Sequence, residues 1–386
     1  MSGVSRAPLS VLDLVPVASG SDAPTALRHS VDLAQQAERL GYARYWVAEH
    51  HLNDGVAGTA PAVVIALLAG ATSTIRVGAG AVQMGHRTAL STVEEFGLLD
   101  AAFPGRIDLG LGRSGGRPPG GEQHGSPVPL VDRRTPEGLL VPEKVSLAAL
   151  AGSPRFALQR ELLQLPGAQS ADYGEQADII SAFIEGSYRS DSGVRARVVP
   201  GERAALQLWV LGSSGGESAQ VAGKRGLRFA ANYHVNPAGV LEAVHAYRAA
   251  FEPSEQLPAP HVAVSADVVV APTEAEAREL ATGYGLWVRS IRTGEGAIAF
   301  PTPDEARAWR WTEEDRALVQ DRVDTQFVGT PGQVADRLEV LQRATAADEL
   351  VVTTITHDHD DRVRSYALLA EEWSSSRRPR RLVQTK

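Results

Sequence analysis

Cysteine is absent from the 386-residue sequence. Disulfide bonds, iron–sulfur clusters, thiolate zinc sites and a cysteine nucleophile are therefore excluded. No apolar run approaches the roughly 20 residues that a membrane-spanning helix requires, and the N-terminus lacks the pattern of a signal peptide. Excess positive charge is missing too, since the net charge is −8 and the pI is about 5.7, which argues against a nucleic-acid partner. We therefore expect a cytoplasmic protein that binds neither membrane nor nucleic acid.

Short apolar, β-branched runs alternate along the chain with longer segments of helical periodicity. Eight strands separated by helices is the number that a closed parallel (β/α)8 TIM barrel requires. The alternative is an open, doubly wound sheet, but no GxGxxG follows the first strand. We expect one α/β barrel domain over residues 1–373, with strands at 9–17, 44–49, 75–84, 106–112, 206–212, 227–232, 261–271 and 349–356.

The helices are predicted from the spacing of apolar residues and from proline and glycine at their ends. The segment 61–71 is apolar nearly all round, which indicates a buried helix. Residues 114–170 are too long for an ordinary loop and are either a lid or a surface insertion, and 374–386 are expected to be disordered. Helices are expected at 24–41, 61–71, 90–103, 172–188, 216–225, 238–251, 274–287, 304–324, 332–343 and 361–372.

Polar residues gather where the predicted strands end. In a barrel of this type the carboxyl ends of the strands carry the active site. Glu49, Arg113 and Asn232 lie at such positions. Six of the ten histidines do so as well: His50, His51, His86, His234, His357 and His359. The pattern predicts an active site at this face without naming its reaction.

The run Ser213-Ser214-Gly215-Gly216 joins an apolar strand directly to a helix. Free N–H groups and the helix dipole make such a junction suitable for a phosphate, and Arg113 is the cation expected to complete it. The alternative is an ordinary serine cap.

Two other features have competing interpretations. Glu49-His50-His51 could bind a metal, but the other strand ends offer no matching set of ligands, so no metal is predicted. Glycines 78 and 80, within the third strand, indicate close approach of a ligand or a corner of the barrel.

These segments together resemble the bacterial luciferase-like flavin monooxygenase family, in its single-chain branch of oxidoreductases. The resemblance runs in order from residue 9 to residue 371, apart from the insertion. The matching runs are LSVLDLVPV, AERLGYARYWVAEHH, IRVGAGAV, FPGRIDLGLGR, LWVLGSS, SAQVAGKRGLRFA, VGTP and DELVVTTITHDHDDRVRSYALLAE.

The resemblance implies FMN as the cofactor, with positions carried over one at a time. His50 falls on the family's catalytic histidine. Arg113 falls on the arginine that binds the flavin phosphate, and Ser213, Ser214 and the adjoining Gly215 on the phosphate loop. Gly80 and Ala81 fall where the family often has a cis peptide against the flavin ring.

The chain departs from the family pattern on the substrate side. Where relatives carry an asparagine–histidine pair in a proline-containing turn, this sequence reads Gln83-Met84-Gly85-His86-Arg87. The candidates for substrate or lid contacts are therefore His51, Gln83, His86 and His234.

The resemblance further implies a two-component monooxygenase. A separate flavin reductase would supply reduced FMN, and O2 would add at the flavin C4a position to give a peroxide that attacks a small organic substrate, with a natural product as one candidate. His50 would act as general acid or base. Two alternatives remain open: hydride transfer with the deazaflavin F420, and flavin binding without catalysis. Luciferase-like barrels often form homodimers through early helices, and 61–71 could serve.

Overall fold

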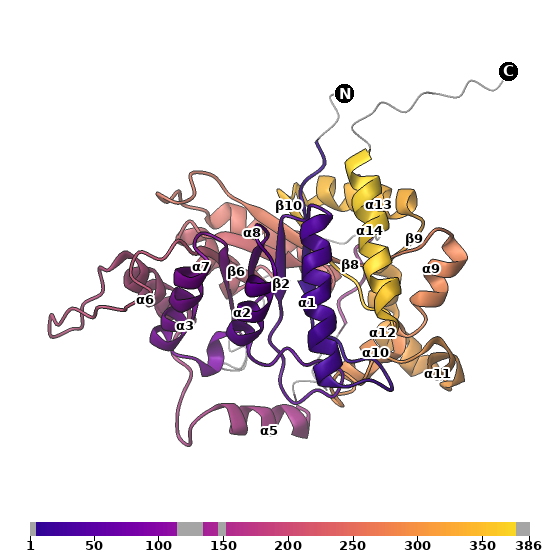
Figure 1. Ribbon diagram of the computed structural model, residues 1–386, viewed down its shortest axis with the longest axis horizontal. Helices are drawn as coiled ribbons and strands as arrows, with labels where there is room; N and C mark the ends of the chain where they lie inside the picture. The colour runs from indigo at the N-terminus through magenta and orange to yellow at the C-terminus, as the bar shows by residue number, and fades with distance from the viewer. Residues whose placement is uncertain (1–4, 114–133, 146–151, 376–386) are drawn as a thin grey trace.

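The computed structural model describes residues 5–113, 134–145 and 152–375. Its parallel strands close into a barrel, as predicted, in the order β10-β1-β2-β3-β5-β6-β7-β8, and β8 pairs with β10. Figure 1 shows α1 and α14 side by side along the outside of the barrel, with α5 set apart at one end. No helix of the described part combines the length and apolar character that crossing a membrane demands.

The strands are short and almost entirely buried, because each is covered by its neighbours, by helices and by the barrel interior. All nine residues of β8 are buried, for example. The strands are β1 (Leu9–Asp13), β2 (Arg44–Val47), β3 (Arg76–Ala79), β4 (Val82–Gln83), β5 (Ile107–Gly112), β6 (Gln207–Gly212), β7 (Arg228–Asn232), β8 (Val262–Val270), β9 (Phe327–Gly329) and β10 (Glu349–Thr353).

Most predicted helices are found within a few residues of their expected ends. The helices of the described part are α1 (Ala23–Arg39), α2 (Pro61–Ala71), α3 (Ala89–Ala102), α5 (Pro154–Leu163), α6 (Tyr173–Glu185), α7 (Glu217–Lys224), α8 (Val240–Ala250), α9 (Glu274–Leu280), α10 (Tyr284–Arg292), α11 (Pro303–Ala308), α12 (Glu313–Thr325), α13 (Pro331–Thr345) and α14 (His359–Ser375). Two short 3-10 turns are η1 (Met84–His86) and η2 (Pro237–Gly239).

The expected third strand, 75–84, is not continuous. It divides into β3 and β4 around Gly80 and Ala81, and Met84 begins η1. Gly78 is explained by its neighbours in the barrel, since a Cβ there would lie 2.4 Å from the carbonyl oxygen of Asp108. At this glycine the barrel interpretation is therefore favoured over approach of a ligand.

Several helix predictions were wrong in detail. The expected helices 274–287 and 304–324 are each two helices, since α10 begins anew at Tyr284 and Thr312 caps α12. The helix 61–71 is not buried all round, because Val63 and Leu67 are 63% and 46% exposed. Helix α5 and the short strand β9 were not expected at all.

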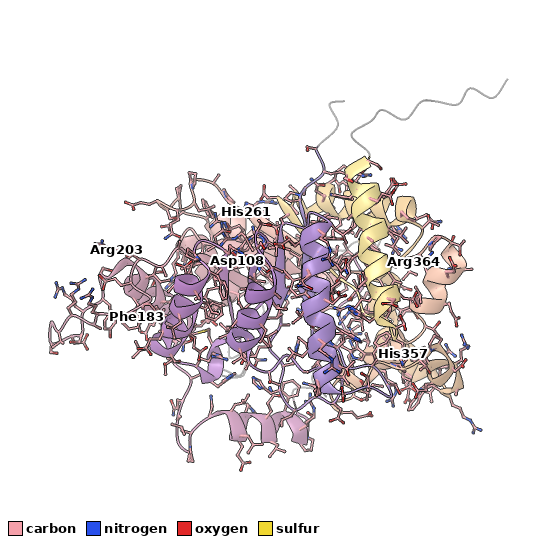
Figure 2. All side chains as sticks on the ribbon, in the orientation of Figure 1. Asp108, Phe183, Arg203, His261, His357 and Arg364 are labelled. Carbon is pink, nitrogen blue, oxygen red and sulfur yellow. The ribbon has the colours of Figure 1, made fainter. Side chains whose placement is uncertain are left out.

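Charged side chains plug the amino-terminal end of the barrel. Arg44 donates to Asp108 and to Glu349, each at 2.7 Å, and Arg76 and the Trp46 indole also donate to Asp108. Asp108 is fully buried. Figure 2 places Asp108 toward one end of the barrel, whereas His357, which follows β10, lies toward the other. This end therefore serves stability, as expected for a barrel of this type.

The described parts of the insertion lie against the carboxyl ends of the strands. Tyr233, just after β7, donates to the Leu140 carbonyl at 2.7 Å. On the other side of the barrel, Arg155 of α5 donates to the carbonyl of Leu52, which follows β2. The insertion therefore contacts opposite sides of the barrel mouth. Residues 114–133 and 146–151 of the predicted lid, and most of the predicted disordered tail, lie outside the described residues.

Candidate active site

His50 follows β2 and has its backbone N–H bonded to the Gly58 carbonyl at 2.8 Å. Its Nδ1 atom is buried and has no hydrogen-bond partner among the described residues. Burial, together with the smaller effect of the charge of His51, lowers the pKa of His50 to about 4. The ring is therefore neutral at pH 7, and its buried Nδ1 atom can form a hydrogen bond with a ligand.

His234 follows β7 and is close enough to His50 for the two charges to interact. It is buried, and its Nδ1 forms a hydrogen bond with the Ser265 hydroxyl. Burial lowers the pKa of His234 to about 3, with smaller contributions from the charges of Arg322 and His50. The two histidines thus come together inside the barrel mouth, both uncharged at neutral pH.

Replacing His234 with glutamine is expected to reduce the loss in the free energy of unfolding that the protein shows as the pH is lowered. The unfolded ring takes up a proton below pH 6.5, whereas the folded one does so only near pH 3. Its contribution is therefore complete above pH 6.5 and is lost on acidification by up to about 1.4 kcal/mol per pH unit. Urea unfolding at pH 7.5 and 5.5 measures this, with the exposed His245→Gln as control. Equal pH slopes in H234Q and the wild type would contradict it.

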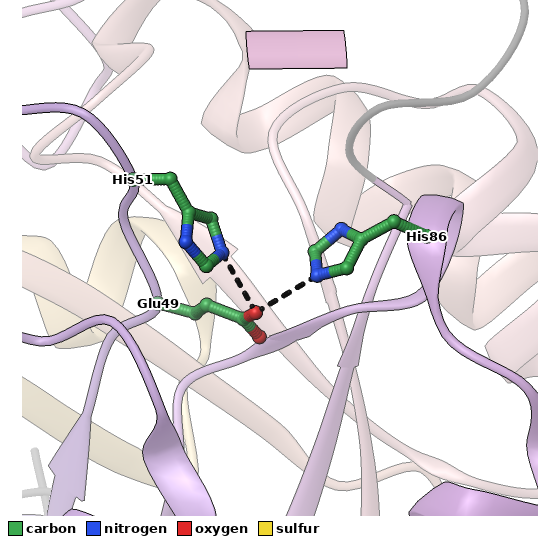
Figure 3. A group of neighbouring side chains, drawn as sticks. All are labelled: Glu49, His51 and His86. Atoms are coloured by element: carbon green, nitrogen blue, oxygen red, sulfur yellow. Dashed lines mark hydrogen bonds and ion pairs between the residues drawn. The ribbon is translucent and has the colours of Figure 1, made fainter. Parts of the chain in front are cut away.

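Glu49, the residue before His50, joins the ends of two strands. Its Oε1 accepts from Nε2 of His51 at 2.9 Å and Nε2 of His86 at 3.1 Å (Figure 3). Its Oε2 accepts from the Gln83 backbone N–H, and Arg87 donates to Oε1 at 3.3 Å. Although burial raises the pKa of Glu49, hydrogen bonds from the two histidines and the charge of Arg87 hold it well below its usual range. Glu49 is therefore ionised throughout the neutral range.

Glu49, His51 and His86 place three potential ligand atoms within 4.8 Å of one another. A divalent cation needs open space and free lone pairs at such a centre. Here the guanidinium of Arg87 already lies against the shared carboxylate oxygen, and the second oxygen is bonded to Gln83. The arrangement fits a hydrogen-bonded carboxylate better than a metal centre.

The predicted phosphate loop connects β6 to α7. Gly216 caps α7 without a side-chain hydrogen bond, which leaves N–H groups of the first turn available to a ligand. A Cβ at Gly215 would lie 2.9 Å from a carboxylate oxygen of the exposed Glu242, so a side chain here would require Glu242 to move. The Asn236 amide donates to the Ser213 carbonyl at 2.6 Å and fixes the turn. The backbone here is shaped to receive an anion.

Arg113 lies beside this loop, because β5 and β6 are neighbours with Gly112 opposite Leu211. Its guanidinium forms an ion pair with Glu217, the first residue of α7, at 3.1 Å. Both side chains are about two-fifths exposed, at 44% and 40%. Arg113 therefore reaches the helix N-terminus, as predicted, but it is already paired with a carboxylate that the sequence analysis did not consider.

Replacing Glu217 with glutamine is expected to tighten FMN binding by roughly two- to fivefold, the effect of one exposed charge pair. The change frees Arg113 and removes a negative charge from beside a phosphate. Quenching of flavin fluorescence measures the affinity. Glu313→Gln is the matched control, because Glu313 is likewise the first residue of its helix, α12. Weaker binding by E217Q would instead mean that Glu217 holds Arg113 in place.

The remaining predicted residues fall into two groups. The Gly80–Ala81 peptide bond is cis, as the resemblance implies, and Gln83 donates its side-chain amide to the Glu49 carbonyl. His357 and His359 do not join the other histidines: His357 bonds the Ser19 carbonyl, and His359 bonds Asp32 and stacks on His29.

The barrel and its strand-end histidines define a class of α/β-barrel enzyme, and the comparisons specify the family. Residues 8–348 match the family described as luciferase-like monooxygenase, and the chain belongs to this family of oxidoreductases. It is 35% identical over 368 residues to the uncharacterized protein YvbT of Bacillus subtilis, covering 95% of this chain and 97% of that one. It is 33% identical to the luciferase-like monooxygenase of Escherichia coli K12, covering 93% and 95%.

Solved structures agree with this assignment. The crystal structure of apo-MsnO8 has a TM-score of 0.75 and 32% identity, and the match covers 96% of this chain and 98% of that one. The oxygenating constituent of 3,6-diketocamphane monooxygenase, in complex with FMN, has a TM-score of 0.61 at 18% identity, covering 95% and 98%. An F420-dependent secondary alcohol dehydrogenase has a TM-score of 0.58 at 13% identity, covering 95% and 99%. These last two share the fold alone.

Proposed function

We propose that the protein is an FMN-dependent monooxygenase that receives reduced FMN from a separate reductase and acts on a small organic substrate. The observation that carries this proposal is the meeting of Arg113 with the open first turn of α7, at the same barrel face as the unpartnered Nδ1 of His50. One end of the site is suited to a phosphate and the other to a reacting group. Of the proteins that share the fold, one is in complex with FMN.

The chain's own residues divide the work. Ser213, Ser214 and Gly215 would bind the phosphate with Arg113, and Gly80–Ala81 would contact the flavin ring. Bound reduced FMN supplies the electrons that activate O2. His50 offers an uncharged ring that can accept a proton near the reacting atoms. The insertion acts as a lid that excludes water, a role supported by its contacts on opposite sides of the barrel mouth.

Titration with FMN and with F420, followed by oxygen consumption, tests the proposal. We expect FMN to bind and F420 not to bind, and a panel of small organic substrates to accelerate oxygen uptake with reduced FMN. F420 binding alone would favour hydride transfer, as in the alcohol dehydrogenase that shares the fold. FMN binding without any substrate-dependent uptake would indicate a flavin-binding protein without catalysis.

An apolar surface on α2 and α3 supports a homodimer. Val63 and Leu67 of α2 are exposed, as are Leu90 and Leu98 of α3, and the two helices pack together. Apolar side chains grouped on a surface favour association. We propose that a second copy covers them.

Leu98→Glu is expected to weaken this dimer by roughly 100-fold, because an apolar contact worth about 3 kcal/mol is lost. Sedimentation velocity at several concentrations measures the change. Leu162→Glu is the matched control, since Leu162 of α5 is 63% exposed and Leu98 is 62% exposed. The proposal would be contradicted if the wild-type protein were monomeric. It would also be contradicted if L98E dimerised as strongly as the wild type.

A further inference from the structure

The ring of His86 has its protonation pattern set by Glu49. An ionised carboxylate can only accept hydrogen bonds, so the Nε2 atom of His86, 3.1 Å from Glu49 Oε1, carries the hydrogen. A neutral ring with hydrogen on Nε2 has a lone pair on Nδ1. Figure 3 shows the Nε2 edges of both His51 and His86 turned toward Glu49, so the Nδ1 edge of His86 faces away from the carboxylate.

This Nδ1 atom is buried without a hydrogen-bond partner among the described residues, and so is Nε of the next residue, Arg87. Buried polar atoms without partners are rare and costly. Two of them side by side in sequence, on the turn that leads from β4 to α3, indicate a place where a ligand supplies the missing bonds.

The turn that carries His86 also lies under the insertion. The carbonyl of Gly85, the preceding residue, accepts from the Gln164 amide at 3.0 Å and from the Ser170 hydroxyl at 2.5 Å. The Gln176 amide of α6 donates to the Arg87 carbonyl at 3.0 Å. The turn is thus held by hydrogen bonds from the insertion and from α6, and His86 lies on a fixed backbone at the carboxyl ends of the strands, where the resemblance places the substrate.

We propose that His86 is the proton acceptor for a substrate with an acidic hydroxyl group, a phenol or an enol, and that Glu49 is the positioning residue behind it. The inference rests on the proposed function, which brings a substrate to this face. The lone pair on Nδ1 requires a donor, which a carboxylate substrate lacks at neutral pH. An ordinary alcohol holds its proton too strongly for an imidazole to remove it.

The step is a proton transfer. The O–H bond of the substrate breaks, its electron pair stays on the oxygen, and an N–H bond forms at Nδ1 of His86. The resulting imidazolium is balanced by Glu49 through Nε2, in the manner of a carboxylate–histidine pair in a hydrolase. The guanidinium of Arg87, the next residue, stabilises the oxygen anion, and delocalisation of the electron pair makes a carbon atom of the phenolate or enolate nucleophilic.

The ionisation of 4-nitrophenol, whose phenolate absorbs visible light, tests the inference on the FMN-loaded and the FMN-free protein. In the wild type we expect the bound probe to ionise at a pH lower by about one unit or more than in free solution, the effect of an adjacent positive charge. His86→Asn and His86→Gln should abolish this shift. Glu49→Gln should reduce the shift while the probe still binds. His245→Asn, an exposed histidine of α8, is the control that should keep it.

The outcomes separate the two proposals. A wild-type protein that leaves the ionisation of the probe unchanged would overturn the inference, and so would His86 variants that keep the full shift. Thermal unfolding verifies that the variants are folded. Two different substitutions of His86 are used so that the test still stands if one variant fails to fold. A shift that depends on His86 in a protein that fails to bind FMN would support the proton acceptor and refute the proposed cofactor.

Discussion

Replacing His50 with alanine is expected to lower substrate-dependent turnover by roughly 10²–10⁴-fold, the range for loss of a general acid or base. FMN binding should stay unchanged, because the residues proposed to bind its phosphate lie on other strands, at Arg113 and the β6–α7 junction. Steady-state oxygen consumption with the substrate found by screening measures turnover, and fluorescence quenching measures binding. Wild-type turnover by H50A would remove His50 from the mechanism.

The pH dependence gives a second test of the same residue. Because the pKa of His50 is about 4, the ring is already deprotonated at pH 6. We therefore expect its contribution to kcat/KM to be constant from pH 6 to 8 and to decline only toward pH 4. His245→Ala is the control for loss of an exposed histidine. An inflection near pH 6.5 that disappears in H50A would mean that the charged ring is the active form.

Replacing Asp108 with asparagine is expected to lower the free energy of unfolding by about 3–5 kcal/mol, the cost of leaving a buried charge without its partner. Asp108 accepts from Arg44, Arg76 and the Trp46 indole. An amide group presents hydrogens of its own to these donors, so part of the network is left unbonded. Urea unfolding measures the loss.

Asp178→Asn is the matched control for this variant. Asp178 also forms a two-point ion pair with an arginine, Arg225, but its side chain is 60% exposed. Exposed pairs contribute little, and we expect a loss of less than about 1 kcal/mol. Equal losses in the two variants would show that burial of the network does not govern its contribution.

The barrel could be predicted because buried parallel strands are continuous apolar runs that stand out from amphipathic helices. The errors have physical causes as well. A helical period does not reveal a break such as that between α9 and α10, where the apolar spacing continues across Ala281. A helix that is apolar nearly all round indicates burial without showing which of its sides faces solvent, which is why the exposure of Val63 was missed.

The location of the candidate site could be predicted from the sequence, but the hydrogen-bond partners of its side chains could not. Strand ends converge in any closed barrel, so His50, Arg113 and Ser213 could be located from the pattern of strands. Which side chains form hydrogen bonds with one another depends on the directions in which they point across the barrel. Glu49 and His86 are 37 residues apart and bond through one oxygen atom. Glu217 was not singled out within the helix expected at 216–225, although its carboxylate accepts a hydrogen bond from Arg113, 104 residues away in the sequence.

The two ends of the barrel differ in how their charged groups are bonded, and this has a consequence for engineering. At the amino-terminal end Asp108 and its arginines form a buried ion-pair network, although His261 beside it leaves Nε2 without a hydrogen bond among the described residues. At the carboxyl end His50 and His86 each have a buried nitrogen without a hydrogen bond among the described residues. A library of variants randomised at the carboxyl end of the barrel, in the turns that carry His50 and His86, should consist mostly of folded proteins while their substrate range changes. A library of equal size randomised at the amino-terminal end, around Asp108, should yield mainly insoluble protein. Protein designers seeking new chemistry from this scaffold can therefore restrict diversity to the turns after β2, β4 and β7.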